Sequence, residues 1–455
     1  MSDDVSAVGS FVPRGGVTYV DKWIALAGLF ALLMLNIALP VWKISTVPIR
    51  GLFAGALLVA LGALYPAHAA RAVRENGQLL GLVAGLALIG IFVSAVNGLA
   101  PGVITQAVIE MHLQAAVMIM VAFIVAYICG ARACMLAIIG AIALSGLTAM
   151  LQAVGIDAAW DIRHWLAGLQ NQEVVLESGK NRPLGLSFSP IQLATQLCLA
   201  FAVYAAVRDK QRQHPNGVVG ADPAVFPALL VFAAVAVACG TRSPILGALL
   251  FFAFYAAQRR GTWLSFLIML GGLTVYLLGP MLLDMIQSTQ PRLVETDDKS
   301  ATGRMSLFTF GLILFRDNPL GYGLEFSPTD HWTDYWHYLY TLPSAVVVQT
   351  QELHNYALNM LNTYGIGLLL LVPTIFGLLR RGKASLLFFI PYVVHIAFHN
   401  SGPLWNDMII WFVVAAISVA GQNLPVDQRH EHAGAHGRRR QYSHRSGPHP
   451  RPYPG

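Results

Sequence analysis

Charged residues are scarce in this chain. Asp, Glu, Lys and Arg make up 11% of the 455 residues, whereas hydrophobic residues make up 56%. A soluble domain carries about 25% charged residues, so this chain cannot cover a water-facing surface of ordinary size. The sequence therefore predicts an all-α polytopic membrane protein with one membrane domain and its loops, rather than a series of soluble domains.

Cysteine and the common nucleotide or metal motifs are also scarce or absent. Cys129, Cys134, Cys198 and Cys239 lie in or beside apolar runs without metal-ligand spacing, so neither disulfides nor a zinc site is expected. The sequence contains no Walker motif, dinucleotide fingerprint, HExxH or nucleophile elbow, and we expect no cofactor and no nucleic-acid partner. The polar beginning of the chain does not resemble a cleavable signal peptide, and the apolar run from Trp23 is long enough to remain as an anchor.

Long apolar runs recur along most of the chain. A transmembrane helix needs roughly 20 apolar residues, with a range of about 17 to 25. About twelve runs approach this length; they predict spans at Trp23–Leu39, Val47–Leu64, Leu79–Val96, Leu113–Cys129, Cys134–Val154, Phe188–Val207, Val225–Cys239, Pro244–Ala257, Thr262–Leu278, Tyr356–Leu379, Ala384–Phe398 and Trp405–Val419. The chain then divides into an N-terminal segment at 1–22, a membrane domain at 23–420 and a tail at 421–455.

Basic residues predict how the protein is oriented. Lys and Arg are enriched in cytoplasmic loops. With the N-terminus inside, the inner connections contain Arg71, Arg74, Arg132, Arg208, Lys210, Arg212, Arg259, Arg260, Arg380, Arg381 and Lys383. This alternation agrees with about twelve spans in a bacterial inner membrane and with both termini in the cytoplasm. The tail at 421–455 is rich in His, Arg, Gly and Pro and is expected to be a disordered, solvated segment that touches anionic membrane lipids, with a metal-binding tract as the alternative.

The orientation places one long loop, residues 281–352, on the periplasmic side between the ninth and tenth spans. Loops of this length are usually functional or disordered, and the aromatic content of this one argues against disorder. We expect it to fold onto the membrane surface with a short helix near Ser306–Arg316. Two shorter segments, Gly155–Gly185 and Gly240–Ser243, are predicted on the same side.

Three arginines on the predicted outer side run against the positive-inside tendency. Arg182, Arg242 and Arg304 each lie close to a predicted membrane boundary, and Arg242 occupies a tight connection without an acidic residue nearby in the sequence. Phosphate is the partner whose planar, bidentate recognition most favours Arg over Lys. The arginines therefore predict a phosphate site. The alternative is that each side chain snorkels and anchors a helix end.

A histidine marks the end of the long loop. His354 lies where the loop enters the tenth span, and its ordinary pKa near 6.5 suits a general base or acid. Asn355 is placed to orient a polar group. The alternative is a hydrogen-bonded structural histidine, which is the role we expect for His395 and His399 near the same boundary.

Two further groups of residues allow more than one interpretation. Glu110 and His112 enter the fourth span together, as a polar pair or as separate interface residues. Gly321-Tyr-Gly323 is typical of a turn, and a phosphate-cradling role would require a helix N-terminus directly after it.

Four motifs then occur in order along the chain. They are Arg182-Pro-Leu-Gly185 with Ser189-Pro190, Gly240-Thr-Arg-Ser-Pro-Ile-Leu-Gly247, Gly303-Arg-Met-Ser-Leu307 followed by Asn318-Pro-Leu-Gly-Tyr-Gly323, and Leu353-His-Asn-Tyr-Ala-Leu358. Together they resemble the O-antigen ligase and O-antigen polymerase superfamily of bacterial envelope glycosyltransferases. The likeness covers residues 181–374 in motif detail and the whole chain in topology. Ile191 is a departure, because the family pattern often has Asn there.

The resemblance implies a GT-C-like, metal-independent enzyme with its active site facing the periplasm. The implied donor is a glycan on undecaprenyl diphosphate. By position, Arg242 and Arg304 match the family's diphosphate-binding arginines, with Arg182 as a third candidate, and His354 matches its essential histidine, with Asn355 in support. The chemistry that fits is direct displacement with inversion, in which a histidine removes the proton of the acceptor hydroxyl and fixed arginines stabilise the leaving diphosphate.

Several functions stay open at this level. A ligase would use lipid A–core as its acceptor, and a polymerase would use another lipid-linked repeat unit. The spacing of Arg242 to Leu246 and the His354-Asn355 pair favour the ligase. A transporter or lipid flippase is a more distant alternative, which the lack of internal repeats and of ionisable residues at mid-membrane disfavours. A scaffolding protein is a further alternative.

Overall fold

The computed structural model describes residues 17–44, 47–171, 182–212, 222–258, 299–405 and 407–420. The predicted span Thr262–Leu278, the first part of the long loop, most of the N-terminal segment and the tail lie outside these residues. Within the described residues the chain is almost entirely helical, and the strands are the two-residue pair β1 (Lys43–Ile44) and β2 (Val47–Pro48), which is antiparallel. The all-α fold class is therefore confirmed.

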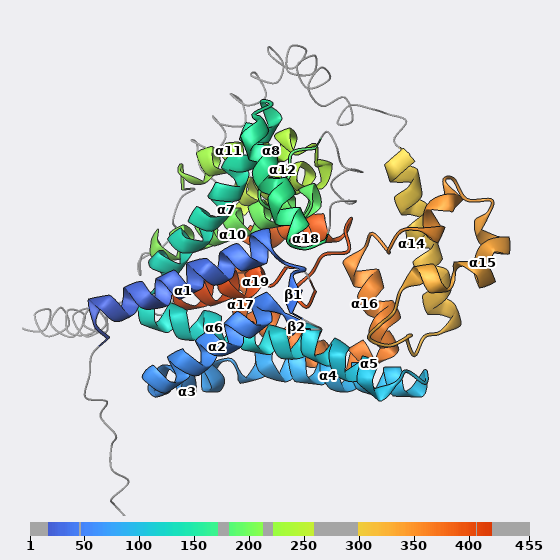
Figure 1. The fold of residues 1–455 in the computed structure, drawn as a ribbon, viewed down its shortest axis with the longest axis horizontal. Coiled ribbons are helices and arrows are strands. Elements are labelled where there is room, and N and C mark those ends of the chain that lie inside the picture. Colours follow the sequence, from blue (N-terminus) through green and yellow to red (C-terminus); the bar gives the residue numbers. More distant parts are fainter. Residues whose placement is uncertain are drawn as a thin grey trace, which may run out of the picture.

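Figure 1 shows the arrangement of the described helices and strands. The first half contains α1 (Tyr19–Ala38), α2 (Ile49–Leu64), α3 (Pro66–Glu75), α4 (Gly77–Val96), α5 (Pro101–Ala107), the π-helix η1 (Val108–Leu113), α6 (Gln114–Cys129), α7 (Ala131–Ala153) and α8 (Asp157–Gly168). The second half contains α10 (Pro190–Arg212), α11 (Val225–Ala238), α12 (Arg242–Gln258), α14 (Lys299–Asp317), η3 (Pro328–Asp330), α15 (Trp332–Leu339), η4 (Ala345–Gln349), α16 (Tyr356–Tyr364), η5 (Gly365–Leu371), α17 (Val372–Leu386), η6 (Leu387–Phe389), α18 (Ile390–Ile396) and α19 (Ile409–Ala420).

Six of the helical segments in the described residues are long and apolar enough to cross a membrane. A seventh results if α2 and α3, which meet at an angle of 114°, are counted as one bent span. Every predicted span except Thr262–Leu278 overlaps helical residues, but several of these helices, including α11 and α19, are shorter than a full crossing. A multi-pass membrane protein is thus supported, and the count of about twelve spans stays a prediction.

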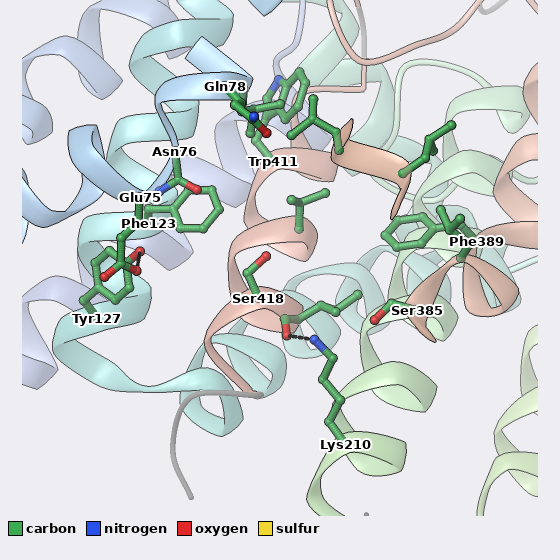
Figure 2. A pocket seen from close by; sticks show the side chains of 16 residues that line it. Glu75, Asn76, Gln78, Phe123, Tyr127, Lys210, Ser385, Phe389, Trp411 and Ser418 are labelled. Atoms are coloured by element: carbon green, nitrogen blue, oxygen red, sulfur yellow. Dashed lines mark hydrogen bonds between the residues drawn. The ribbon is translucent and has the colours of Figure 1, made fainter. Parts of the chain in front are cut away.

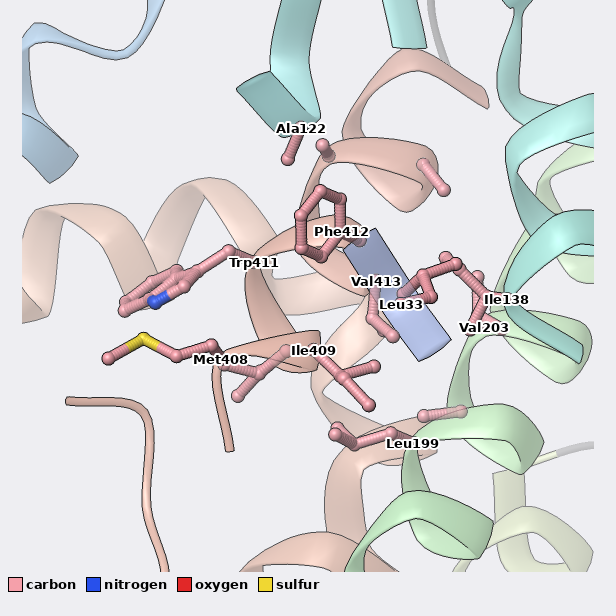
Figure 3. Close-up of a cluster of buried hydrophobic side chains, with 14 of the residues drawn as sticks. Leu33, Ala122, Ile138, Leu199, Val203, Met408, Ile409, Trp411, Phe412 and Val413 are labelled. Carbon is pink, nitrogen blue, oxygen red and sulfur yellow. The ribbon is translucent and has the colours of Figure 1, made fainter. Parts of the chain in front are cut away.

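Helix α19 forms the centre of the apolar core. Figure 3 shows its side chains, among them Phe412 and Val413, facing residues of other helices, including Leu33, Ala122 and Leu199. The residues of α19 are buried around its whole circumference, which is typical of a helix enclosed by its neighbours. Because lipid tails are as apolar as leucine, such packing stabilises the bundle through close contact and dispersion rather than through removal from water.

The described part of the long loop is folded. Helices α14 and α15 lie to one side of the bundle in Figure 1, and α16 connects them to it. The predicted short helix near Ser306–Arg316 lies within the longer α14. The loop has an apolar cluster of its own, formed by Leu307, Phe310, Leu314, Phe326, Leu339, Val348, Leu353 and Leu358.

The turn at Gly321–Gly323 joins the loop to the bundle through the backbone. Tyr322 N and Gly323 N donate to Asn362 O at 2.7 Å and Thr363 O at 3.1 Å. Gly321 has φ +90°, and a Cβ there would meet the backbone of Gly365 at 2.6 Å. Only glycine allows this conformation and this approach at once. The turn therefore attaches the loop to the bundle at the point where α16 ends and η5 begins.

A close contact between α12 and α18 places the polar residues described below. A Cβ on Gly247 would lie 2.6 Å from Pro391 Cα and 3.0 Å from Pro391 O. Ser243 and Phe251 share the face of Gly247, because residues four apart lie on one side of a helix. Phe251 packs edge-on against Phe201 of α10, with ring centroids 4.8 Å apart.

We expect Gly247→Ala to push α12 and α18 apart. Overpacking of a close contact costs about 1–3 kcal/mol, so the melting temperature of the detergent-solubilised protein should fall. Gly55→Ala in α2 is the matched control, because a Cβ there meets no atom within 4 Å and alanine is the better helix former by about 1 kcal/mol. Equal melting temperatures for Gly247→Ala and the wild type would contradict the close contact.

Candidate active site

Three histidines and a serine from separate segments converge at the end of the bundle next to the long loop. We call Ser243, His354, His395 and His399 the histidine group. Ser243 Oγ lies 2.9 Å from His395 Nδ1 and 3.1 Å from His399 Nε2. The ring centroids of His395 and His399 are 4.4 Å apart, and those of His354 and His399 are 6.3 Å apart.

The hydrogen bonds assign the tautomers of two of these histidines. His395 Nε2 lies 3.2 Å from Ile191 O, and because a carbonyl oxygen only accepts, Nε2 carries the proton. His395 Nδ1 then accepts from the Ser243 hydroxyl, which in turn accepts from His399 Nε2. His399 Nδ1 is left as a buried lone pair without a partner among the described residues. The arrangement keeps both imidazoles neutral and fixed in orientation.

His354 is half-buried where the loop enters α16. Its Nε2 lies 3.1 Å from Gln351 Oε1, an acceptor, so Nε2 carries the proton and Nδ1 holds the free lone pair. Burial, and in second place the positive charge of Arg304, lower the pKa of His354 from 6.5 to about 4. His354 is therefore a neutral base at pH 7.

Asn355 fixes the backbone next to His354. Its Oδ1 accepts from Leu358 N at 2.9 Å and so caps the N-terminus of α16. Its Nδ2 donates to Ala397 O at 3.0 Å, directly after α18. This one side chain therefore connects the segment of His354 to the segment of His399.

Arg182 holds the turn between α11 and α12. Its Nη2 donates to Gly240 O at 3.1 Å and to Cys239 O at 3.3 Å, carbonyl groups at a helix end that lack intrahelical partners. The charge of Arg182 also acts on His399. The structure thus places Arg182 beside the histidine group and shows that its guanidinium binds backbone carbonyls.

The other two predicted arginines come from the same region. Arg242 is half-buried at the first position of α12, directly before Ser243. Arg304 is half-buried on α14, and its charge acts on His354, His395 and His399. The hydroxyl of Ser243 connects the α11–α12 turn to the histidine group, while Arg304 belongs to the loop side.

Sequence reasoning missed Ser243 as a functional candidate and interpreted His395 and His399 as merely structural. Both histidines are almost fully buried, at 0% and 1% exposure, and they share Ser243 with the turn that carries Arg242. His395 lies on α18 and His399 lies three residues after its end. Two histidines in so apolar a segment were a usable signal, because buried polar groups need hydrogen-bond partners.

Glu110 and His112, at the start of the fourth predicted span, do not bind each other. Glu110 binds Lys43 Nζ at 2.8 Å, whereas His112 Nε2 lies 2.8 Å from the hydroxyl of Tyr364. Both belong to the π-helix η1. π-Helical turns are rare and are frequently found at functional sites.

A separate cavity of about 470 Å³ lies among α3, α4, α6, α10, α17 and α19. Figure 2 shows Glu75, Tyr127, Lys210 and Trp411 around it, with Lys210 Nζ donating to Ile417 O at 2.7 Å. None of the predicted site residues lines it. Neither here nor in the histidine group do the described residues place three or more His, Cys, Asp or Glu side chains so that they could hold a metal ion.

Comparison with known proteins gives a match to a family model over part of the chain. No curated protein matches it significantly. Residues 227–373 match the family model described as O-antigen ligase. The matched segment contains the Gly240–Gly247 motif, the Gly303–Leu307 motif and the motif around His354, whereas Arg182 precedes it. This match supports the resemblance of the chain, over residues 227–373, to the O-antigen ligase and polymerase superfamily.

Proposed function

We propose that this protein transfers a glycan from undecaprenyl diphosphate to an acceptor hydroxyl at the periplasmic face of the bacterial inner membrane. The superfamily supports glycosyl transfer with lipid-linked glycans in general. The observation that carries the specific proposal is the position of His354, a neutral base at the loop exit, under the charge of Arg304. A base next to a fixed cation suits a reaction in which a proton leaves one substrate and negative charge grows on the other.

In this mechanism His354 Nδ1 accepts the proton of the acceptor hydroxyl. The hydroxyl oxygen forms a bond to the anomeric carbon as the bond from that carbon to the diphosphate oxygen breaks. The electron pair of the broken bond leaves with undecaprenyl diphosphate, and the anomeric configuration inverts. The diphosphate is a good leaving group, so the reaction needs charge stabilisation there more than a proton donor. No metal ion or cofactor is required in this scheme.

We assign different roles to the three arginines. Arg242 and Arg304 bind the diphosphate, since a guanidinium can contact two phosphate oxygens in one plane. Arg182 positions the turn that carries Arg242, because its Nη2 is bound to the carbonyl oxygens of Cys239 and Gly240. Asn355 supports His354 through its two hydrogen bonds to the backbone. Aromatic side chains of the loop at 281–352 stack on sugar faces.

The two versions of the proposed function differ in the identity of the acceptor. We favour lipid A–core, which makes the protein a ligase, on the grounds of the Arg242-to-Leu246 spacing and the His354-Asn355 pair. The alternative acceptor is a second lipid-linked repeat unit, which makes it a polymerase. Reconstituted protein with lipid-linked glycan and each acceptor in turn distinguishes them. Glycan on lipid A–core supports the ligase, a ladder of lipid-linked products supports the polymerase, and no transfer to either rejects the function.

His354→Ala should abolish transfer while the protein still inserts into the membrane. A positioned base typically contributes about 10²–10⁴-fold to such a step, and the rate in proteoliposomes measures the loss. The matched control is His164→Ala, which removes an exposed imidazole from α8 and should leave the rate unchanged. Wild-type turnover in His354→Ala would remove this histidine from the mechanism.

The pH profile should show the lowered pKa of His354. Because the neutral form is the base, kcat/KM should stay level as the pH falls from 7.5 to about 5.5 and decline only as the pH approaches the pKa near 4. Arg304→Gln removes a positive charge that lowers this pKa, so the acid limb should move upward toward 6.5 in addition to any loss of rate.

Arg316→Gln is the control for the pH profile, because Arg316 lies exposed on the same helix and pairs with Asp317. It should leave the acid limb in place. An acid limb at 6.5 in the wild type, or one that Arg304→Gln does not move, would contradict the electrostatic coupling of Arg304 to His354.

Arg242→Lys should reduce kcat/KM for the lipid-linked donor by about tenfold or more, since an ammonium group cannot reproduce the two parallel hydrogen bonds of a guanidinium. The rate at low donor concentration is the measurement. Arg71→Lys, on the exposed face of α3, is the matched control. Equal kcat/KM in Arg242→Lys and the wild type would exclude Arg242 as a diphosphate ligand.

A further inference from the structure

A smaller cavity, of about 220 Å³, lies beside the loop and is lined by polar and charged residues, none of which belongs to the histidine group. It is lined by residues of and before strands β1 and β2, the start of α2, the π-helix η1, the loop residues Leu324 and Glu325, and the segment before α19 at Leu404–Trp405. In Figure 1 these strands lie at the end of α1 that faces α14, α15 and α16. The cavity and the histidine group share one connection, because residues 397–407 carry His399 and then Trp405.

Arg50 forms the polar wall of this cavity and is not fully satisfied by the protein. The residue is only 5% exposed. Its Nη2 donates to Trp405 O at 3.1 Å, and its Nε donates to Gln114 Oε1 at 2.9 Å in the amide orientation that also satisfies Gln114 Nε2. Among the described residues Nη1 has no hydrogen-bond partner. The protein thus fixes two of the guanidinium nitrogens, and Arg50 brings a positive charge to the cavity wall.

Carboxylates line the same cavity. The π-helix η1 places Glu110 and Met111 on its wall, next to Gln114 at the start of α6. Glu110 pairs with Lys43 at 2.8 Å, and Glu325 lies exposed at the mouth. Burial, followed by the charge of Glu110, raises the pKa of Glu325. Asp407, which is 3% exposed, acts electrostatically on Arg50.

The charged and polar side chains of this cavity favour one class of ligand over others. A phosphate would be attracted by Arg50 but repelled by Glu110 and Glu325. An apolar chain would leave the charged groups of the cavity wall without polar partners. A sugar ring carries hydroxyl groups that both donate and accept, so it can accept from a guanidinium and donate to carboxylates. The half-buried Trp405 adds an aromatic wall of the kind on which a sugar face packs.

We propose that this cavity is a sugar-binding subsite, in which Arg50, Glu110, Glu325 and Trp405 hold one hexose-sized ring of a glycan substrate. The sugar comes either from the acceptor or from the donor glycan, and this part of the inference rests on the proposed function. The recognition itself does not, because free sugars can be tested without any transfer reaction.

The binding test uses saturation-transfer NMR on the full-length protein in detergent micelles, with D-glucose, D-galactose, D-mannose and N-acetyl-D-glucosamine as probes. We expect at least one sugar to bind the wild type and to bind Glu325→Gln and Arg50→Gln about tenfold more weakly. Glu325→Gln is the primary variant, because its side chain is exposed and its replacement leaves the fold unchanged. Glu75→Gln is the matched control: it removes a carboxylate that pairs with Arg71 at 2.8 Å and does not line this cavity, and it should bind sugar normally.

The kinetic test identifies the source of the sugar in the reconstituted system. If the acceptor occupies the subsite, Glu325→Gln should raise the acceptor KM by about tenfold while kcat and the donor KM stay within about twofold. If the donor glycan occupies it, the donor KM should rise instead. A merely structural role of Glu325 would lower kcat or protein yield and leave both KM values unchanged.

Three outcomes would overturn the subsite. They are no binding of any of the four sugars to the wild type, equal binding by Glu325→Gln and the wild type, and displacement of a bound sugar by inorganic phosphate, which would indicate an anion site. Failure of glycan transfer together with normal, Glu325-dependent sugar binding would reject the proposed function and leave the subsite standing.

Discussion

The packing of α12 on α18 is the constraint on which the candidate active site depends. Gly247 lets the two helices approach until its Cα lies against the backbone of Pro391, and this approach brings the Ser243 hydroxyl between His395 and His399. A larger residue at 247 would separate the helices, and the buried imidazole groups would lose their shared partner. In an environment without water, an unsatisfied buried polar group costs several kcal/mol. The backbone contact and the polar group therefore stabilise each other.

A second constraint connects the long loop to this arrangement. Asn355 caps α16 and also donates to Ala397 O, and the Gly321–Gly323 turn pairs with the backbone at Asn362 and Thr363. Through these contacts α14 brings Arg304 toward His354. The site is thus assembled from a bundle half, which contributes Arg182, Arg242 and Ser243, and from a loop half.

Under the proposed function, the two polar regions bind chemically different parts of one substrate. The histidine group places neutral bases near the predicted arginines, which suits the proposed proton removal beside a diphosphate. The Arg50 cavity combines a guanidinium with carboxylates and Trp405, which suits a ring of hydroxyl groups. Residues 397–407 connect them, because this one segment contributes His399 to the first and Trp405 to the second. A glycan that occupied both regions would be fixed at its reacting end and at one sugar along its length.

The sequence by itself determined the all-helical membrane class, since a chain with so few charges can satisfy its backbone in lipid only through helices or closed barrels. It also indicated the resemblance to the O-antigen ligase family, because the motifs around Arg242, Arg304 and His354 are short and can be recognised without the fold. Other features depended on tertiary structure. Arg182 binds carbonyl groups, His395 and His399 share Ser243, and Arg50 and Glu325, from distant segments, line one cavity. No local pattern contains these contacts, because each joins residues whose separation in sequence says nothing about their distance in space.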